Sequence, residues 1–303
     1  LRLVGSEMCI RDSVNTGFCG MTNDIYAARA ALHMWEEPCI SGEHGSGAVF
    51  FSGCTLRCIF CQNAEIAAAH VGKKITVERL SDIFLELQDK CANNINLVTA
   101  THFVPQVAEA LIKAKNKGLV IPVVYNSSAY ENVSTLNMLD GLVDVYLPDM
   151  KYIDSRLSAE YSKAPDYADV AKAAIHEMVR QTGKPEFFIV DDELVKSGRV
   201  EAGIMKKGVI VRHLVLPGTT KDSKAVIKYL IDTYGDDIYI SIMSQYTPFE
   251  RLKKHPLLSR KVTRKEYNSV VDYAIDCGIN NGFIQEGDVA EESFIPEFDY
   301  EGI

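Results

Sequence analysis

Three cysteines lie close together in the stretch GCTLRCIFCQN. Cys54, Cys58 and Cys61 are separated by three and two residues, and this spacing lets one short loop turn three thiolates toward one point. Three soft ligands on one loop suit a zinc ion or an iron–sulfur cluster. A structural zinc site takes four ligands, usually as two separated pairs, whereas the nearest histidine, His70, has no partner at such a spacing. The odd count favours a four-iron cluster with one open iron, and zinc stays the alternative.

The composition of the chain restricts the classes of protein to which it can belong. The 303 residues are 47% hydrophobic, and 41 acidic residues outnumber 32 basic ones. This is globular composition, and the acidic balance predicts no nucleic-acid partner. An apolar run of about 18 residues would be needed to cross a bilayer, so the sequence predicts no membrane association. Eight cysteines are too few for a disulfide scaffold in a chain of this length, which indicates reduced thiols and a cytoplasmic protein.

Six short apolar runs alternate with helical patterns along the chain. Near-continuous apolar runs of this length are typical of parallel strands buried on both faces. Thr76 is the expected N-cap of one helix, and Thr263 with Glu266 has the spacing of a capping box before another. We therefore predict an α/β fold, with the three cysteines at the carboxyl end of its first parallel strand. The predicted strands cover residues 48–52, 95–99, 121–125, 143–147, 209–216 and 238–243.

The chain divides into four predicted parts. Residues 1–13 contain MCIRDS, which resembles a translated sequencing adaptor, so we expect them to be non-native and Cys9 to carry no meaning. Residues 14–47 form a truncated N-terminal extension, 48–285 the main domain, and 286–303 a C-terminal tail. An insertion at 149–208 is expected to hold a helix near 166–181 and a hairpin from 185–190 to 199–204. The glycine-rich stretch 42–47 is interpreted as a turn with weak phosphate-binding potential.

The cysteine spacing, with Phe60 just before the third cysteine, resembles that of the radical S-adenosylmethionine (SAM) superfamily. The resemblance implies a partial (β/α)6 TIM-like barrel of the radical SAM type with a short N-terminal extension. It also implies that a [4Fe–4S] cluster binds SAM at its open iron and reductively cleaves it to a 5′-deoxyadenosyl radical. The segments NLVTATHFVPQ, VYLPDMKY and GVIVRHLVLPG look like the subfamily similar to pyruvate formate-lyase activating enzyme.

If SAM is the cofactor, polar side chains at the strand ends are candidates to bind it. The set begins with Thr99, Thr101 and His102, which follow the second predicted strand and could meet the ammonium group of SAM, or could simply cap a turn. Asn126 and Ser127 end the third strand and could bond the ribose or the carboxylate, although polar residues there also cap turns. The activating enzymes carry a D-x-K motif that contacts the cofactor, and the fourth strand here is followed by a similar motif.

That motif places Asp149 and Lys151 as expected contacts to the ribose diol and the carboxylate, with a surface ion pair as the alternative. Arg212 interrupts an apolar strand, where a charge needs a partner; it could bind the SAM carboxylate or form a salt bridge inside the barrel. Its neighbour His213 should point the other way and serve the core. Phe60 could stack near the adenine or shield the cluster. Candidates for the substrate opening, on position alone, are Gln245 and Tyr246.

The resemblance implies that the radical abstracts a hydrogen atom from a substrate. It favours a protein glycine, as in the activation of a glycyl-radical enzyme, with modification of another protein or of a small molecule as the alternative. A non-enzymatic iron–sulfur or zinc redox protein is the rival class. A flavodoxin or ferredoxin is the implied electron donor. Of the other cysteines, Cys19 could belong to a second metal motif, and the remainder are expected to be structural, namely Cys39, Cys91 and Cys277.

Overall fold

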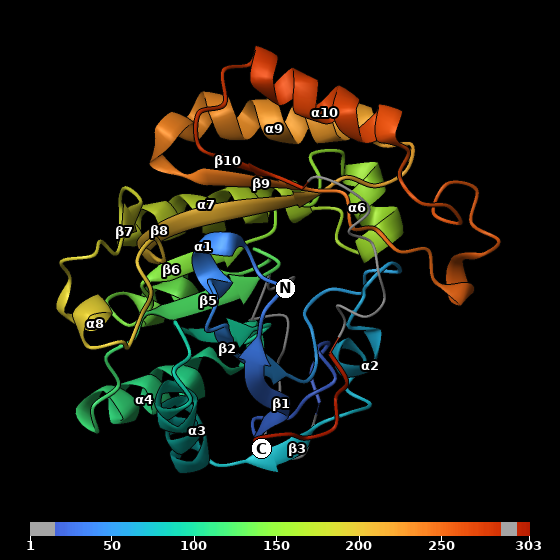
Figure 1. Cartoon of the computed structure of the whole chain (residues 1–303). Helices are drawn as coiled ribbons and strands as arrows, with labels where there is room; N and C mark the ends of the chain where they lie inside the picture. The colour runs from blue at the N-terminus through green and yellow to red at the C-terminus, as the bar shows by residue number, and fades with distance from the viewer. Residues whose placement is uncertain (1–15, 286–295) are drawn as a thin grey trace.

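The structure, a computed structural model, describes residues 16–285 and 296–303. The predicted non-native segment 1–13 lies outside the described residues, as do Cys9 and most of the predicted C-terminal tail. The strands, in chain order (Figure 1), are β1 (Ile25–His33), β2 (Ser46–Phe51), β3 (Lys73–Ile75), β4 (Ile95–Val98), β5 (Val123–Ser127), β6 (Val145–Pro148), β7 (Glu186–Phe187), β8 (Met205–Leu214), β9 (Tyr239–Met243) and β10 (Gly282–Ile284).

The described strands form one sheet in the order β10-β9-β8-β6-β5-β4-β2-β1-β3, with β7 paired to β8. All neighbours from β2 to β10 on this path run parallel, and β1 lies antiparallel to both β2 and β3. The six predicted strands correspond to β2, β4, β5, β6, β8 and β9. This mostly parallel sheet confirms the predicted α/β fold of partial-barrel type. The sequence pattern missed β1, β3 and the short parallel β10.

The helices connect the strands and lie mainly outside the sheet. The expected N-cap is confirmed, since the Thr76 side chain accepts from the Arg79 amide, and the capping box of Thr263 with Glu266 is formed. The helices are α1 (Pro38–Ser41), α2 (Ala64–Ala67), α3 (Val77–Asp89), α4 (Val104–Asn116), α5 (Val133–Leu136), α6 (Ser155–Ser162), α7 (Tyr167–Thr182), α8 (Glu193–Lys196), α9 (Thr220–Tyr234) and α10 (Arg264–Asp276), with 3-10 turns η2 (Thr101–Phe103), η3 (Asn137–Leu139), η4 (Gly235–Asp237) and η5 (Glu250–Leu252).

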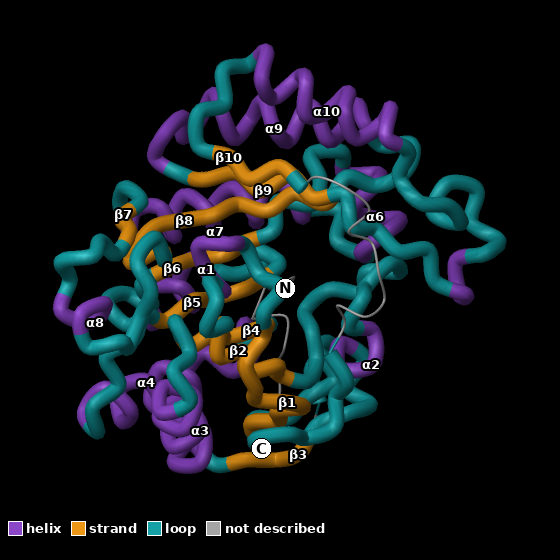
Figure 2. Tube along the Cα trace, viewed as in Figure 1, coloured by secondary structure: helices purple, strands orange, loops and turns teal. Residues whose placement is uncertain are grey.

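The two faces of the parallel sheet pack against different parts of the chain. On β5, Val123 and Tyr125 belong to the large core shared with the outer helices, whereas Val124 faces the inside of the curve. There it packs with Cys39 and Ile40 of α1. Figure 2 shows α1 within the curve of the strands, with α3, α4, α7, α9 and α10 around the outside. The segment around α1 therefore fills the inner side of the barrel and forms its floor.

The insertion at 149–208 differs in part from its prediction. Helix α7 confirms the predicted helix, and α6 precedes it as a helix that the pattern did not show. The hairpin prediction is wrong in the bounds of its second strand, because β7 pairs with the start of β8 at Met205 and Lys207. Only Gly203 and Ile204 of the predicted segment 199–204 form backbone hydrogen bonds with the first arm, at Phe188. The apolar residues at 200, 202 and 204 alternate as in a strand, but the glycines at 198 and 203 lie in turns with φ of +72° and +85°.

The glycine-rich stretch 42–47 is already occupied by the protein itself. The backbone amides of Glu43 and His44 donate to the Glu201 carboxylate at 2.8 and 2.5 Å. The Asn93 side chain donates to the same carboxylate at 2.7 Å. This carboxylate takes the two amides that a phosphate would need, so the weak phosphate-binding potential is not realised here.

The described part of the C-terminal tail packs against β1. The Tyr300 amide donates to the Ala28 carbonyl at 3.1 Å, and Arg29 forms an ion pair with Asp299 at 2.6 Å. Phe298 contacts the ring of Phe50 edge-on, with centroids 5.6 Å apart. Among the described residues, we find no helix that combines the length and the apolar character required to cross a bilayer.

Candidate active site

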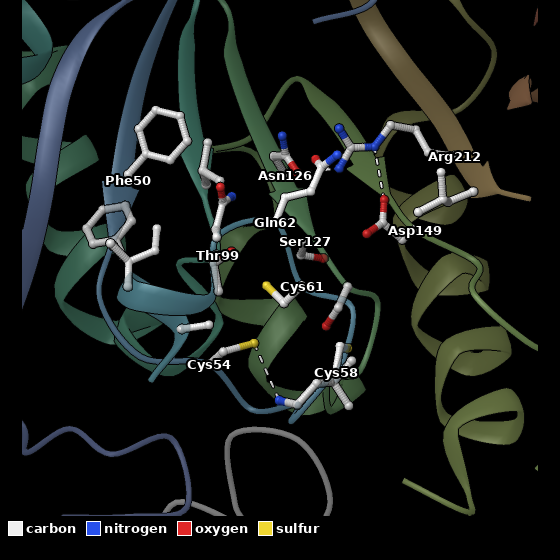
Figure 3. A pocket seen from close by; sticks show the side chains of 18 of the residues that line it. Phe50, Cys54, Cys58, Cys61, Gln62, Thr99, Asn126, Ser127, Asp149 and Arg212 are labelled. Carbon is white, nitrogen blue, oxygen red and sulfur yellow. Dashed lines mark hydrogen bonds and ion pairs between the residues drawn. The ribbon is translucent and has the colours of Figure 1, made fainter. Parts of the chain in front are cut away.

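A cavity of about 250 Å³ opens at the carboxyl ends of the parallel strands (Figure 3). This is the end of a parallel α/β barrel at which loops gather binding groups. Most of the predicted site residues line it together: Cys54, Cys58, Phe60, Cys61, Thr99, Asn126, Ser127, Asp149, Lys151, Arg212 and Gln245. Thr101, His102 and Tyr246 do not line this cavity. The strand ends predicted from the sequence therefore converge on one space.

The three predicted metal ligands lie in the loop between β2 and α2. Figure 3 shows the sulfur atoms of Cys54 and Cys61 facing the same space. Burial raises the pKa of Cys54 to about 11 and of Cys61 to about 12, and the neighbouring cysteines add to both shifts. Burial also raises the pKa of Cys58, against the opposing charge of Lys151. A bound cation would favour the thiolates that this environment otherwise keeps protonated.

This donor set fits an iron–sulfur cluster. The three side chains are soft sulfur ligands, they come from one stretch of eight residues, and all three line one cavity. Within the described residues, no three His, Cys, Asp or Glu side chains are gathered closely enough to hold a single metal ion.

The cysteine loop is held in place from several elements. Gly53 begins it with φ +86°, and a Cβ there would lie 2.4 Å from the Met21 side chain, so this turn requires glycine. Arg57 donates to the Cys54 carbonyl at 3.2 Å. Ile59 donates its amide to the Tyr161 carbonyl at the end of α6, at 2.8 Å. These contacts fix the loop backbone.

A hydrogen bond from helix α6 reaches a cysteine sulfur directly. The Ser162 hydroxyl donates to Cys58 Sγ at 3.0 Å, and the Tyr152 hydroxyl lies 2.9 Å from the Ser162 oxygen. Tyr152 also packs edge-on against Phe60, with ring centroids 6.4 Å apart. Phe60 is itself buried and lines the cavity. Helix α6, which the sequence pattern missed, thereby supplies a polar partner to one of the three sulfurs.

A charged wall lies beside the cysteine loop, built from the ends of β6 and β8. Asp149 lies between two cations: Lys151 Nζ is 2.6 Å from Oδ2, and Arg212 Nε is 3.0 Å from Oδ1. Burial alone would raise the pKa of Asp149, but the charges of Lys151 and Arg212 hold it below its usual range. The carboxylate is therefore ionised, and the ion pair given as the alternative role of Asp149 and Lys151 is present, but it is half-buried and does not lie on the surface.

Arg212 is bound by three acceptors. Besides Asp149, its guanidinium donates to Glu36 Oε2 at 3.2 Å and to Asn126 Oδ1 at 2.6 Å. The salt bridge inside the barrel, one of the two roles expected for Arg212, is thus present. Its neighbour His213 faces the other way, as expected: it is buried, and its Nδ1 lies 2.8 Å from the Met150 carbonyl. Burial lowers the pKa of His213 to about 4.

Glu36 is a residue of the cavity lining that the sequence gave no means of finding. It lies just before α1 and reaches into the barrel, where its Oε1 accepts from Asn96 and Asn126, each at 3.1 Å. The contact to Arg212 completes a polar floor. Trp35 lines the same cavity and is 61% exposed. In the sequence, Glu36 stands in a triplet of a tryptophan followed by two glutamates, and this triplet is not a motif with a characteristic spacing that would point to a site.

Thr99 lies at the cavity in an uncommon backbone conformation. Its φ of +61° is left-handed, which costs a β-branched residue about 1–3 kcal/mol and is found most often at functional sites. Thr101 and His102 point elsewhere: both are buried, and His102 Nε2 lies 2.7 Å from the Ser52 carbonyl. The structure therefore brings only the first of the three to the cavity.

Tyr246 and Gln245, adjacent in sequence, have separate roles. Gln245 lines the cavity, and its carbonyl accepts from Gln62 at 3.1 Å. Tyr246 is buried and donates to the Leu258 carbonyl. The latter therefore supports the segment that follows β9, instead of forming part of the opening.

The comparison with family models agrees with this geometry. The model of the radical SAM superfamily matches residues 48–230, which is more than half of the chain and includes the three cysteines and the charged wall. The chain therefore belongs to the radical SAM superfamily. Members of this superfamily bind a [4Fe–4S] cluster and SAM.

The individual relatives do not define the subfamily. An uncharacterized protein of Methanocaldococcus jannaschii is 28% identical over 265 residues, covering 85% of this chain and 69% of the relative. Streptococcus suis SuiB, solved with its precursor peptide SuiA, has a TM-score of 0.50 and 14% identity over 78% of this chain; the match spans 47% of SuiB, about half its length. A pyruvate-formate lyase-activating enzyme domain from Bacteroides vulgatus has a TM-score of 0.38 and 12% identity, over 60% of this chain and 91% of the domain.

Proposed function

We propose that Cys54, Cys58 and Cys61 hold the [4Fe–4S] cluster and that the adjoining cavity binds SAM. The cluster supplies one electron to cleave SAM, and the resulting 5′-deoxyadenosyl radical abstracts a hydrogen atom from a substrate. The observation that carries this proposal is the convergence of three sulfur donors and a half-buried charged wall on one cavity. Reduced thiols and an oxygen-sensitive cluster favour the cytoplasm as its location.

The charged wall provides the contacts that SAM requires. Asp149 offers a carboxylate to the ribose diol or the sulfonium, and Lys151 offers an ammonium to the SAM carboxylate. A guanidinium has five N–H donors. Arg212 uses three of them in hydrogen bonds to other described residues, so two further donors can serve the cofactor. Ser127 and Thr99 each add a hydroxyl group, and Phe60 adds an aromatic surface. Thr101 and His102 do not line the cavity, and we assign them a supporting role at the end of β4.

The SAM site can be tested on the reconstituted protein. SAM binding is measured anaerobically by the change that it causes in the EPR spectrum of the reduced cluster. Asp149→Asn should weaken binding about tenfold or more, because it removes the charge between two cations. Asp140→Asn, at an exposed ion pair with Arg180, is the matched control. Equal SAM affinity in both variants would contradict the role of the charged wall.

We further propose that the hydrogen atom comes from a protein glycine, as in the activation of a glycyl-radical enzyme. The resemblance of the segments around Thr99, Asp149 and Arg212 supports this choice, and the structural neighbour SuiB was solved bound to a precursor peptide. The test uses a glycyl-radical enzyme carrying α-deuterated glycine. Deuterium in the 5′-deoxyadenosine product is expected. Product formed without deuterium would point to another protein position or to a small molecule.

A further inference from the structure

The segment from η5 to the first turn of α10 has a charge opposite to that of the rest of the chain. Residues 250–266, here called the basic lobe, contain seven basic and two acidic residues, whereas the whole chain has 41 acidic and 32 basic ones. Lys253 and Lys254 are exposed. The acidic residues of the lobe are used within it, since Glu250 pairs with Lys253 and Glu266 with Arg260. The basic lobe is therefore a concentrated region of positive charge on a protein whose net charge is negative.

The basic lobe is attached directly to the cysteine loop. Arg251 Nε donates to the Ile59 carbonyl at 3.0 Å, and its Nη2 donates to the Cys61 carbonyl at 2.5 Å. His255 packs edge-on against Tyr161 of α6, whose carbonyl holds the same loop. Figure 1 shows this part of the chain, coloured orange, projecting beyond α6 between β9 and α10.

The basic lobe contacts this loop from outside the cavity. None of its residues is among those that line the cavity, where a substrate must meet the radical. A macromolecule seated on the lobe is thus next to the cysteines, but it does not enter the space in which SAM would react. This position suits delivery of an electron better than delivery of a substrate.

We propose that the basic lobe is the docking surface for an acidic protein that carries one electron. This inference rests on the proposed function, since that reaction consumes one electron per SAM cleaved. In the transfer, the reduced donor loses one electron and the oxidised cluster gains it; no bond is formed or broken between the two proteins. Attraction between opposite charges would raise the association rate without a large interface.

The chain contains a matched control for the test. Lys206 and Lys207 form a second exposed lysine pair at the amino end of β8, the end of the barrel opposite the cavity. The lobe variant is Lys253→Glu with Lys254→Glu, and the control is Lys206→Glu with Lys207→Glu. Both change the net charge equally, so only the place of the charge differs.

The measurement is stopped-flow reduction of the reconstituted cluster by a fully reduced flavodoxin, and separately by dithionite. At low salt the lobe variant should react with flavodoxin on the order of tenfold more slowly, while the control changes little. Rising ionic strength should slow the wild type and narrow this difference. Dithionite reduction should be the same in all three, since it needs no docking.

The outcomes separate this proposal from the proposed function. Equal flavodoxin rates in the lobe variant and the control would overturn the docking surface alone. The wild type could retain RNA that the lobe variant does not retain, while both are reduced by flavodoxin at the same rate. This result would assign the lobe to nucleic-acid binding and would also overturn the docking surface for an electron donor. Failure of the wild type to assemble a cluster that dithionite reduces would overturn the proposed function itself. If the cluster of the lobe variant can no longer be reduced by dithionite, the milder double variant Lys253→Gln with Lys254→Gln replaces it. Its rate of reduction by flavodoxin is then compared with that of the control.

Discussion

The two ends of the cavity are built in different ways. The cysteine loop is a local structure: its three sulfurs come from eight consecutive residues, 54–61, and glycine sets the turn that starts it. The polar floor is assembled from parts of the chain far apart, with Glu36 meeting Asn96 on β4, Asn126 on β5 and Arg212 on β8. The first can be recognised from spacing, whereas the second exists only in the folded molecule.

This difference separates the choice of the bound group from the orientation of what lies beside it. In the proposed function, the soft donors of the cysteine loop determine which group is bound. The proposal assigns the floor and the charged wall to the orientation of the cofactor beside that group, because their hydrogen bonds fix each side chain against at least one other. Substitutions in the loop should therefore abolish binding of the cluster, and substitutions in the floor should leave the cluster in place and alter what depends on it.

The largest expected effect is at the cysteine loop. Cys58→Ala removes one of three sulfur ligands and should abolish the cluster, so the iron content and the EPR signal after reconstitution fall to background. Cys91→Ala, at an exposed position just after α3, should retain the full iron content. A Cys58→Ala protein with wild-type iron and EPR signal would remove the cysteine loop from the proposed site.

Glu36 provides the corresponding test of the floor. Glu36→Ala leaves donors of Arg212, Asn96 and Asn126 without their buried carboxylate, which should lower the free energy of unfolding by roughly 1–3 kcal/mol. Urea denaturation measures this, and iron binding should be kept. Glu109→Ala, at an exposed carboxylate on α4, should change stability by less than about 0.5 kcal/mol. Loss of iron in Glu36→Ala with normal folding would contradict the separation of loop and floor.

The sequence predicted the parts of the site that depend on local pattern. The six parallel strands follow from apolar runs, and residues at or directly after their ends, such as Ser127 and Asp149, reach the cavity because parallel strands end at one edge. The alternation around Arg212 and His213 also placed their side chains on opposite faces. Helix α6 was missed because its apolar residues recur at every second position, as in a strand, and Glu36 because no spacing connects it with its partners.

The end of the second strand shows another limit of such predictions. Thr99, Thr101 and His102 are equivalent as polar residues after a strand, yet only Thr99 lines the cavity. The separation arises from the left-handed backbone at Thr99 and the 3-10 turn that follows it. Strained conformations of a threonine are decided by the surrounding fold, so residue type could not indicate which of the three faces inward.

A buried carboxyl behind the floor should show itself in pH dependence. Glu131 Oε2 accepts from Tyr125 at 2.6 Å, and burial raises the pKa of Glu131 to about 7. Its protonated form thus stabilises the fold fully below about pH 4.5, and this stability is lost as pH rises through 7. Glu131→Gln should match the wild type at pH 4.5 and exceed it at pH 8 by about 1–3 kcal/mol. If the free energy of unfolding depends on pH in the same way in the wild type and in Glu131→Gln, the raised pKa of Glu131 is contradicted.

The smallest expected effect concerns the link between α6 and the cysteine loop. The Ser162 hydroxyl donates to Cys58 Sγ at 3.0 Å, and such a hydrogen bond stabilises the more negative, reduced cluster. Ser162→Ala should lower the midpoint potential by tens of millivolts in an EPR-monitored redox titration, and Ser162→Thr should restore it. A potential unchanged in Ser162→Ala would show that this contact has no influence on the bound cluster.

The most direct test of the proposed function is product formation by the wild-type chain. The protein is reconstituted anaerobically with iron and sulfide, reduced with SAM present, and analysed for 5′-deoxyadenosine and methionine. Both products should appear in equal amounts and be absent from Cys58→Ala. Stoichiometric zinc in the purified protein, with neither product formed after reconstitution, would contradict the proposed radical chemistry.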